Sequence, residues 1–228
     1  MSLGLPPRIV ACLFDLDGVI TQTAKVHAQA WKHTFEAALH VPFDPIKDYD
    51  DYVDGKPRED GVRSFLAARH IPADPALVES IATRKDHLFL ELIHQRGVET
   101  YPGSIQYLQA VRAAHKKLAV VSSSRHTTEV LAAANLKNAF DAQVDGIVAE
   151  REHLKGKPAP DTYLKAAGAL GAKPSEGAVY EDALAGVQAG RAGGFGRVIG
   201  VDRAGQADAL YAHGADVVVK DLAELLAK

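Results

Sequence analysis

The feature that most constrains the fold of this chain is a short apolar segment that ends in two aspartates. Residues 8–14 are nearly all apolar, as is typical of a buried strand in a parallel sheet. Asp15 and Asp17 follow this segment. In open α/β sheets, reacting groups lie beyond the carboxyl ends of the strands. Two carboxylates there suit oxygen-ligated Mg²⁺ and phosphate chemistry, in which one acid attacks and the other moves a proton. The alternative is a carboxylate-rich turn with no chemical role.

Strand and helix patterns alternate in the second half of the chain, which predicts a doubly wound parallel sheet. The first strand must join that sheet, because one strand without a partner is not stable. The fold class expected is therefore α/β with a Rossmann-like core. The further strands are predicted at residues 118–121, 142–144, 178–180, 197–201 and 217–219.

The segment between the first strand and this alternation has only helical patterns, at about 24–39, 58–69 and 75–95. The pair Asp74-Pro75 marks the start of the last one, since aspartate caps helices and proline suits their first turn. We therefore predict an inserted helical cap domain at residues 23–97. The core domain is expected to combine residues 1–22 and 98–228.

Composition limits the classes of protein that fit. The formal net charge is −3, so no basic field indicates a nucleic-acid partner. No apolar window is long enough to span a membrane, and residues 1–7 do not resemble a signal peptide. The single cysteine, Cys12, excludes an internal disulfide and is expected to be a buried core residue. A cytoplasmic monomer is the expectation.

Three further segments place polar groups at strand ends or helix starts. Ser122 ends an apolar run and offers a hydroxyl to a phosphoryl oxygen, although it could be a plain helix cap. Lys157 lies in Lys-Pro-Ala-Pro-Asp, where two prolines fix the backbone around an ammonium that could neutralise a phosphoryl group. Glu181 and Asp182 are adjacent acids that could share a divalent ion with Asp15, although Asp182 could be only an N-cap.

One candidate lies in the predicted cap. Arg58, near a helix start, could hold an anion with two hydrogen bonds, although a solvated arginine is the simpler interpretation. Other chemistries have no support. The sequence has no P-loop, no His-Glu-x-x-His spacing and no Gly-x-Ser-x-Gly elbow, and the segment around Gly194 precedes a strand where a dinucleotide loop would follow one.

Taken in order, Asp15/Asp17, Ser122, Lys157 and Glu181/Asp182 resemble the four motifs of the haloacid dehalogenase superfamily of phosphotransferases, in its arrangement with a helical cap. The resemblance implies that Asp15 is the nucleophile and Asp17 the general acid and base, while Ser122 and Lys157 hold the phosphoryl oxygens. It also implies a Mg²⁺ site formed by Asp15, the Asp17 carbonyl, Asp182 and, directly or through water, Glu181.

Within the superfamily, the run from Asp15 to Lys32 and the segment Gly55 to Asp60 resemble the β-phosphoglucomutase-like subfamily. That likeness implies a role for His27 in positioning Asp17 or a sugar hydroxyl, against the alternative of a packed histidine. The chain departs from the subfamily at Gln22, usually Asp, and at Arg125 and His126, usually Lys and Asn. The substrate-binding residues implied are Thr23, Trp31, Gly55, Arg58, Lys85, Ser123, Ser124, Arg125 and His126.

The reaction implied converts β-D-glucose 1-phosphate to glucose 6-phosphate through β-glucose 1,6-bisphosphate, with a small sugar phosphate as the only partner. Two alternatives stay open from the residues. A phosphatase acting on a small sugar phosphate would use the same nucleophile with water as acceptor. A non-catalytic sugar-phosphate-binding protein would need no pair of nucleophile and acid, which argues against it.

Overall fold

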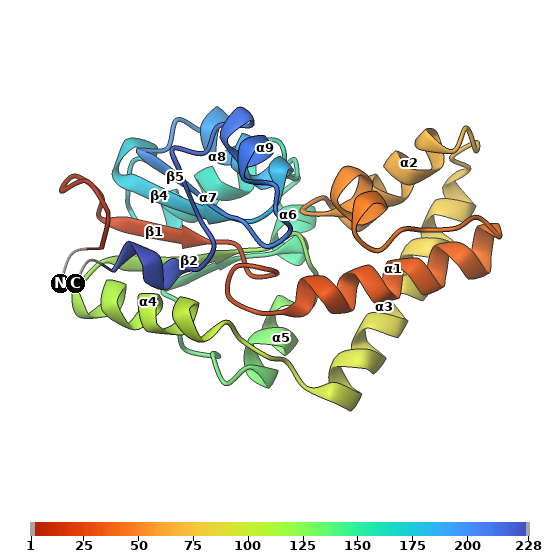
Figure 1. Ribbon diagram of the computed structural model, residues 1–228, viewed down its shortest axis with the longest axis horizontal. Helices are drawn as coiled ribbons and strands as arrows, with labels where there is room; N and C mark the ends of the chain where they lie inside the picture. Colours follow the sequence, from red (N-terminus) through yellow and green to blue (C-terminus); the bar gives the residue numbers. More distant parts are fainter. Residues whose placement is uncertain (1–2, 227–228) are drawn as a thin grey trace.

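A six-stranded parallel sheet forms the centre of the molecule, in a computed structural model that describes residues 3–226 (Figure 1). The strand order is β3-β2-β1-β4-β5-β6, and every neighbouring pair is parallel. The doubly wound α/β class is thereby confirmed. The strands are β1 (Ala11–Phe14), β2 (Lys117–Val121), β3 (Ala142–Val144), β4 (Gly177–Glu181), β5 (Arg197–Val201) and β6 (Val217–Val219).

The position of β1 decides where chemistry can occur. It lies between β2 and β4, and the chain winds outward from it in both directions, which opens a crevice at the carboxyl ends of these strands. Asp15 extends the ladder by one bond, since its N–H donates to the carbonyl of Tyr180 at 2.9 Å. The acidic turn after β1 is therefore anchored at the centre of that edge.

Helices cover both faces of the sheet, which explains why β1 is apolar along its whole length. One face packs against α4 (Pro102–Ala113), α5 (Thr127–Ala133) and the short 3₁₀ helix η3 (Leu222–Leu225). The other packs against α6 (Gly146–Arg151), α7 (Asp161–Ala169), α8 (Leu184–Ala192) and α9 (Ala207–Ala212).

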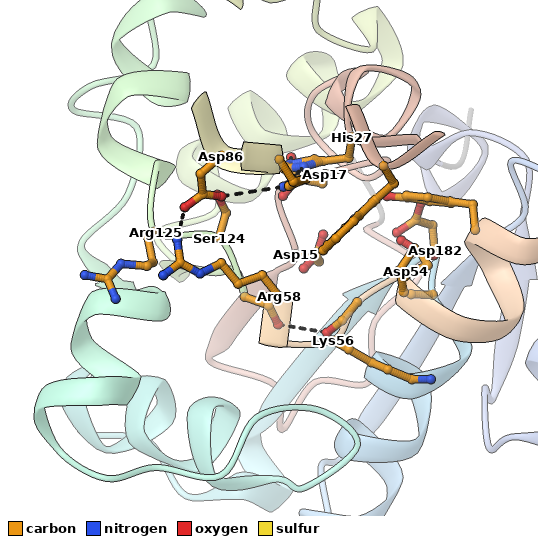
Figure 2. Close-up of a pocket in the computed structure, with 17 residues that line it drawn as sticks. Asp15, Asp17, His27, Asp54, Lys56, Arg58, Asp86, Ser124, Arg125 and Asp182 are labelled. Atoms are coloured by element: carbon orange, nitrogen blue, oxygen red, sulfur yellow. Dashed lines mark hydrogen bonds and ion pairs between the residues drawn. The ribbon is translucent and has the colours of Figure 1, made fainter. Parts of the chain in front are cut away.

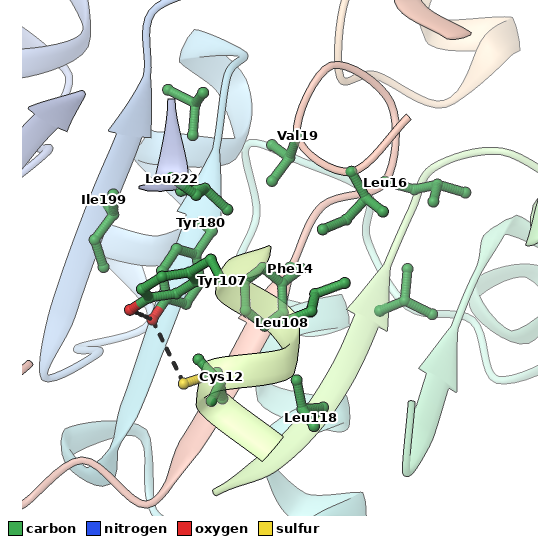
Figure 3. Close-up of a cluster of buried hydrophobic side chains, with 14 of the residues drawn as sticks. Cys12, Phe14, Leu16, Val19, Tyr107, Leu108, Leu118, Tyr180, Ile199 and Leu222 are labelled. Atoms are coloured by element: carbon green, nitrogen blue, oxygen red, sulfur yellow. Dashed lines mark hydrogen bonds between the residues drawn. The ribbon is translucent and has the colours of Figure 1, made fainter. Parts of the chain in front are cut away.

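Cys12 lies in the first of these layers (Figure 3). The Tyr180 hydroxyl contacts its Sγ at 3.5 Å and the Tyr107 hydroxyl at 2.9 Å. Burial raises the pKa of the Cys12 thiol to about 12, so it stays protonated and acts as a small core residue.

The predicted helical insertion consists of α1 (Thr23–Leu39), the π-helical turn η1 (Tyr49–Val53), α2 (Arg58–Ala68) and α3 (Pro75–Arg96), beside the sheet in Figure 1. It has its own apolar core, in which Phe35 stacks against Phe43 and Phe65 at ring-centroid distances of 5.4 and 4.2 Å. Asp74 caps α3 as expected, accepting the N–H groups of Ala76 and Leu77. That this cap folds as a domain of its own, residues 23–97, stays a prediction.

The chain enters and leaves the cap through two adjacent segments. Thr21 and Thr100 form an antiparallel bridge, and the Gln22 N–H donates to the carbonyl of Glu99 at 2.8 Å. The cap is therefore tied to the core by a two-stranded junction next to the acidic turn.

Several short elements differ from the sequence prediction. Strand β1 begins at Ala11 rather than at residue 8, η1 forms in a segment expected to be a loop, and α6 was not predicted. Helix α6 has six residues and none of them is buried, so it carries no apolar periodicity to recognise. Two 3₁₀ turns, η2 (Pro174–Glu176) and η3, were also missed. Among the described residues, no helix combines the length and apolarity that crossing a membrane requires.

The cap core gives a stability prediction. Truncating Phe35, which is fully buried, to Ala should lower the free energy of unfolding by about 3–5 kcal/mol because it removes ring contacts and leaves a cavity. The matched control is Ile46→Ala in the same cap, because the Ile46 side chain is 67% exposed and should change stability by less than about 0.5 kcal/mol. Urea denaturation followed by circular dichroism measures both, and equal effects would contradict the packing described.

Candidate active site at the carboxyl edge of the sheet

A buried ammonium connects two strand ends at the bottom of the site. Lys157 is 3% exposed, so it is not a surface charge. Its Nζ donates to Asp15 Oδ1 after β1, lies 2.5 Å from Glu181 Oε1 at the end of β4, and donates to the Val121 carbonyl of β2 at 3.3 Å. Burial opposes its charge, but Asp15 and Glu181 outweigh that effect and raise the pKa of Lys157, which is therefore permanently charged.

Glu181 is the fixed partner in this arrangement. Its Oε1 also accepts the Tyr163 hydroxyl at 2.7 Å, and its Oε2 accepts the Ala183 N–H at 3.3 Å. The carboxylate fits because residue 186 is glycine, where a Cβ would lie 1.8 Å from Oε1. Glu181 therefore orients Lys157 toward Asp15.

The carboxylates of Asp15, Glu181 and Asp182 lie close together at the carboxyl ends of β1 and β4. One oxygen each of Asp15, Glu181 and Asp182 lies within 4.8 Å of the others, and all three residues are buried. Burial raises the pKa of Asp15 well above its usual range, and Glu181 and Asp17 add to this effect against the charge of Lys157. Burial also raises the pKa of Asp182 well above its usual range, and the neighbouring acids Asp54, Asp15 and Glu181 add to the rise. The single positive charge of Lys157 does not balance these acids, so an oxygen-bound divalent cation fits the remaining negative charge.

The acidic turn approaches Asp182 closely. Gly18 has φ +86°, and a Cβ there would lie 1.7 Å from Asp182 Oδ2, so this position requires glycine for both reasons. Asp182 is not the N-cap of α8, because Ala183 holds that position and no side chain caps the helix. The alternative role considered for Asp182 is therefore wrong, and its carboxylate faces the turn.

The Asp17 side chain points toward the cap rather than toward this cluster (Figure 2). Thr23 Oγ1 donates to its Oδ1, Ser122 Oγ donates to its Oδ2 at 3.2 Å, and His27 Nε2 lies 3.3 Å from Oδ1. Burial works against ionisation of Asp17, but His27, Thr23 and Lys85 outweigh it and lower the pKa to about 2. Asp17 is thus held as an ionised carboxylate near Asp15.

His27 contacts both Asp17 and residues of cap helix α3. Its ring stacks on Phe89 at 3.9 Å, and its Nδ1 lies 2.8 Å from Lys85 Nζ. Burial and the nearby charge of Lys85 lower the pKa of His27, so the neutral ring accepts from Lys85 and turns its Nε2–H toward Asp17. Burial likewise lowers the pKa of Lys85 to about 8. His27 is therefore both packed and polar, and the two alternatives for it are compatible.

A second polar group lies on the cap side of the same pocket (Figure 2). Arg58 donates through Nη1 to Asp86 Oδ2 and through Nε to Glu59 at 2.7 Å, so it is not a solvated arginine. His126 Nε2 lies 3.4 Å from the same Asp86 oxygen. Arg125 turns outward to Glu150 at 2.5 Å. Of these contacts, the one between His126 and Asp86 joins core and cap.

The pocket is lined by most, but not all, of the predicted residues. Asp15, Asp17, His27, Trp31, Gly55, Arg58, Lys85, Ser123, Ser124, Arg125 and Asp182 line it. Ser122 and Lys157 line an adjoining cleft, which shares Arg58, Ser123 and Arg125 with the pocket. Thr23, His126 and Glu181 do not line the pocket and act on it through Asp17, Asp86 and Lys157.

Sequence reasoning missed four polar lining residues: Tyr49, Asp54, Lys56 and Asp86. Burial, together with Glu181 and Asp50, raises the pKa of Asp54 to about 7. These residues lie on η1, on the loop after it and on α3, none of which ends a core strand. Asp86, adjacent to Lys85, and Lys56, adjacent to Gly55, lie next to residues that the resemblance singled out, and this was the signal that could have been used.

Comparison with known proteins agrees with this geometry. Residues 9–194 match the family model described as haloacid dehalogenase-like hydrolase. The chain is 50% identical to a β-phosphoglucomutase of Mycobacterium bovis, covering 98% of this chain and 94% of that protein. It is 34% identical to the Bacillus subtilis β-phosphoglucomutase, covering 94% and 91%. A crystal structure of β-phosphoglucomutase from Clostridium difficile aligns with TM-score 0.83 at 25% identity, covering 96% and 93%. The chain belongs to the haloacid dehalogenase-like hydrolase family, in its β-phosphoglucomutase-like branch.

Proposed function

We propose that this protein is a Mg²⁺-dependent β-phosphoglucomutase, which isomerises β-D-glucose 1-phosphate to glucose 6-phosphate through β-glucose 1,6-bisphosphate. One observation carries the proposal. The pocket has Asp15 and Asp17 on the core side and Arg58 with Lys85 on the cap side, so a sugar with two phosphates has an anchor at each end.

The two core aspartates divide the chemistry. Lys157 holds the Asp15 carboxylate in place and favours its ionised form, and Asp15 attacks the phosphoryl group to form an aspartyl-phosphate. Asp17 lines the same pocket, where it takes the proton of the accepting sugar hydroxyl and returns it to the leaving oxygen. Ser122, which donates to Asp17 and whose Oγ accepts the Ser124 N–H, keeps the loop after β2 in contact with the reacting oxygens.

The residues fit a magnesium ion, with Asp15, Asp182 and the Asp17 carbonyl as direct ligands. When bound, the ion neutralises charge on the transferring phosphoryl group. Glu181 is assigned an outer position, because both of its oxygens already accept hydrogen bonds from protein donors.

The cap supplies the second phosphate site. Arg58 is at present paired with two carboxylates, Asp86 and Glu59, and an incoming phosphate would replace these weaker anions as its partner. Lys85, 5.2 Å above the Trp31 ring, adds a second charge facing the same space.

The proposal is tested by one assay that follows two products. Purified protein is given β-glucose 1-phosphate, Mg²⁺ and a trace of β-glucose 1,6-bisphosphate, and glucose 6-phosphate and inorganic phosphate are measured together. We expect glucose 6-phosphate with little free phosphate, and the Asp15→Asn variant should lose at least about 1000-fold in rate because the nucleophile is absent. Free phosphate without glucose 6-phosphate would establish the phosphatase alternative. Turnover that survives Asp15→Asn would refute the aspartyl-phosphate.

The cap arginine gives a second prediction. Arg58→Ala should lower kcat/KM for glucose 6-phosphate formation about 100-fold, because a charged hydrogen-bond donor to the second phosphate is lost. The control is Arg63→Ala on the same helix. The exposed Arg63 guanidinium pairs with Asp60, and its removal should change kcat/KM less than about twofold. If both variants kept wild-type kinetics, the second phosphate site would have to lie elsewhere.

A third prediction concerns removal of the metal. Treatment with EDTA should abolish both products, and Mg²⁺ should restore them. Because the bound cation relieves the repulsion among Asp15, Glu181 and Asp182, saturating Mg²⁺ should also raise the free energy of unfolding by about 2–3 kcal/mol at 100 times the Kd. The same titration on Asp182→Asn should show little or no stabilisation, whereas full stabilisation of that variant would exclude Asp182 as a ligand.

A further inference from the structure

One short segment of the cap, residues 53–58 and here named the cap loop, lies directly against core loops. Gly55 at its centre is held by two core loops. Its carbonyl accepts the Ser123 hydroxyl at 2.8 Å, and a Cβ on Gly55 would lie 2.9 Å from the Ala183 Cβ. The cap loop is therefore seated directly against the segments that follow β2 and β4.

A third contact involves the core segment before Lys157. A Cβ on Gly156 would lie 2.2 Å from Pro57 Cγ and 2.7 Å from its Cδ, distances that real side chains do not reach. Gly156 is not among the glycines with positive φ, so its backbone would accept alanine. The space at Gly156 is thus needed by the Pro57 ring of the cap loop and not by the core itself.

The contact between Pro57 and Gly156 lies on a cleft that leads toward the proposed phosphoryl site. This cleft, between the cap loop and residues 154–159, reaches Ser122 and Lys157, and the Lys157 Nζ donates to Asp15. If the cap loop were raised, water could approach the aspartyl-phosphate. Its oxygen would form the new bond to phosphorus, the bond from phosphorus to the Asp15 oxygen would break, and Asp17 would take the proton. A sugar hydroxyl reacts in the same way, so the position of the cap loop selects between two acceptors.

We propose that Gly156 is a specificity-determining position, which lets the Pro57 ring seat the cap loop and so directs the phosphoryl group to a sugar rather than to water. The inference rests on the proposed mutase function and adds residues that touch neither phosphate. Gly156 and Pro57 act as positioning residues through the cap loop.

The test is Gly156→Ala, assayed for the ratio of inorganic phosphate to glucose 6-phosphate. An extra methyl against the Pro57 ring disfavours the seated cap loop, and we expect the ratio to rise about tenfold. Gly168→Ala is the matched control, because its Cβ would meet nothing within 4 Å and its φ is not positive, so the ratio should not change.

A second variant separates the contact from any effect on the adjacent Lys157. Pro57→Ala removes Cγ and Cδ and keeps Cβ, which would lie at an ordinary 3.7 Å from a Cβ on residue 156. The double variant Gly156→Ala with Pro57→Ala should therefore return the ratio to within about twofold of Pro57→Ala alone. A double variant as hydrolytic as Gly156→Ala would overturn the proposal in favour of a displaced Lys157.

Hydrogen exchange of the backbone amides in residues 53–58 gives a readout independent of turnover. Gly156→Ala should speed this exchange, and the double variant should restore the protection seen in Pro57→Ala alone. Unchanged exchange and an unchanged ratio in Gly156→Ala would refute the inference and leave the mutase intact. A wild-type protein that makes no glucose 6-phosphate would refute the mutase, and the exchange data would still decide whether the Pro57 contact seats the cap loop.

Discussion

The ion pair of Lys157 with Asp15 and Glu181 is the interaction on which the rest of the site depends. The buried Lys157 ammonium contacts Asp15 after β1, Glu181 at the end of β4 and the last residue of β2. It therefore connects the carboxyl ends of three strands that are distant in sequence. Removing the ammonium or the carboxylates would leave the opposite charge buried and unpaired. The resulting loss of folding stability is far larger than the stabilisation that an exposed ion pair provides. The chemistry and the stability of the sheet edge therefore share the same three side chains.

From this point the site extends outward in two directions. Toward the core, Tyr163 and the Ala183 N–H fix Glu181, so the lysine has little freedom. Toward the cap, Asp17, His27 and Lys85 form a continuous polar chain whose last member lies on α3. Asp17, the proposed acid-base group, thus has partners in the core, through Ser122, and in the cap, through Thr23 and His27. Its surroundings therefore depend on the position of the cap.

The sequence was sufficient for the fold class and for Asp15, Ser122 and Glu181, because strand periodicity and parallel topology bring groups at strand ends to one edge of the sheet. Lys157 was found by a different signal, the two prolines that fix its loop before α7. The sequence was insufficient for Asp54 and Asp86, which enter the pocket from the cap. Their positions depend on how η1 and α3 pack on α1, and no local pattern encodes that packing. Helix α6 escaped prediction for a related reason, since a helix that buries no side chain has no apolar stripe.

The paired crossing at Thr21 and Thr100 has a consequence for how such proteins diversify. Because the cap leaves the core where it entered, the strand order of the sheet and the position of Asp15 are set outside residues 22–99. A different insert joined at this two-stranded junction would lie over the same Asp15, Lys157 and Glu181. The core and the insert can therefore vary separately, and the insert determines which side chains face Asp15 from outside the sheet.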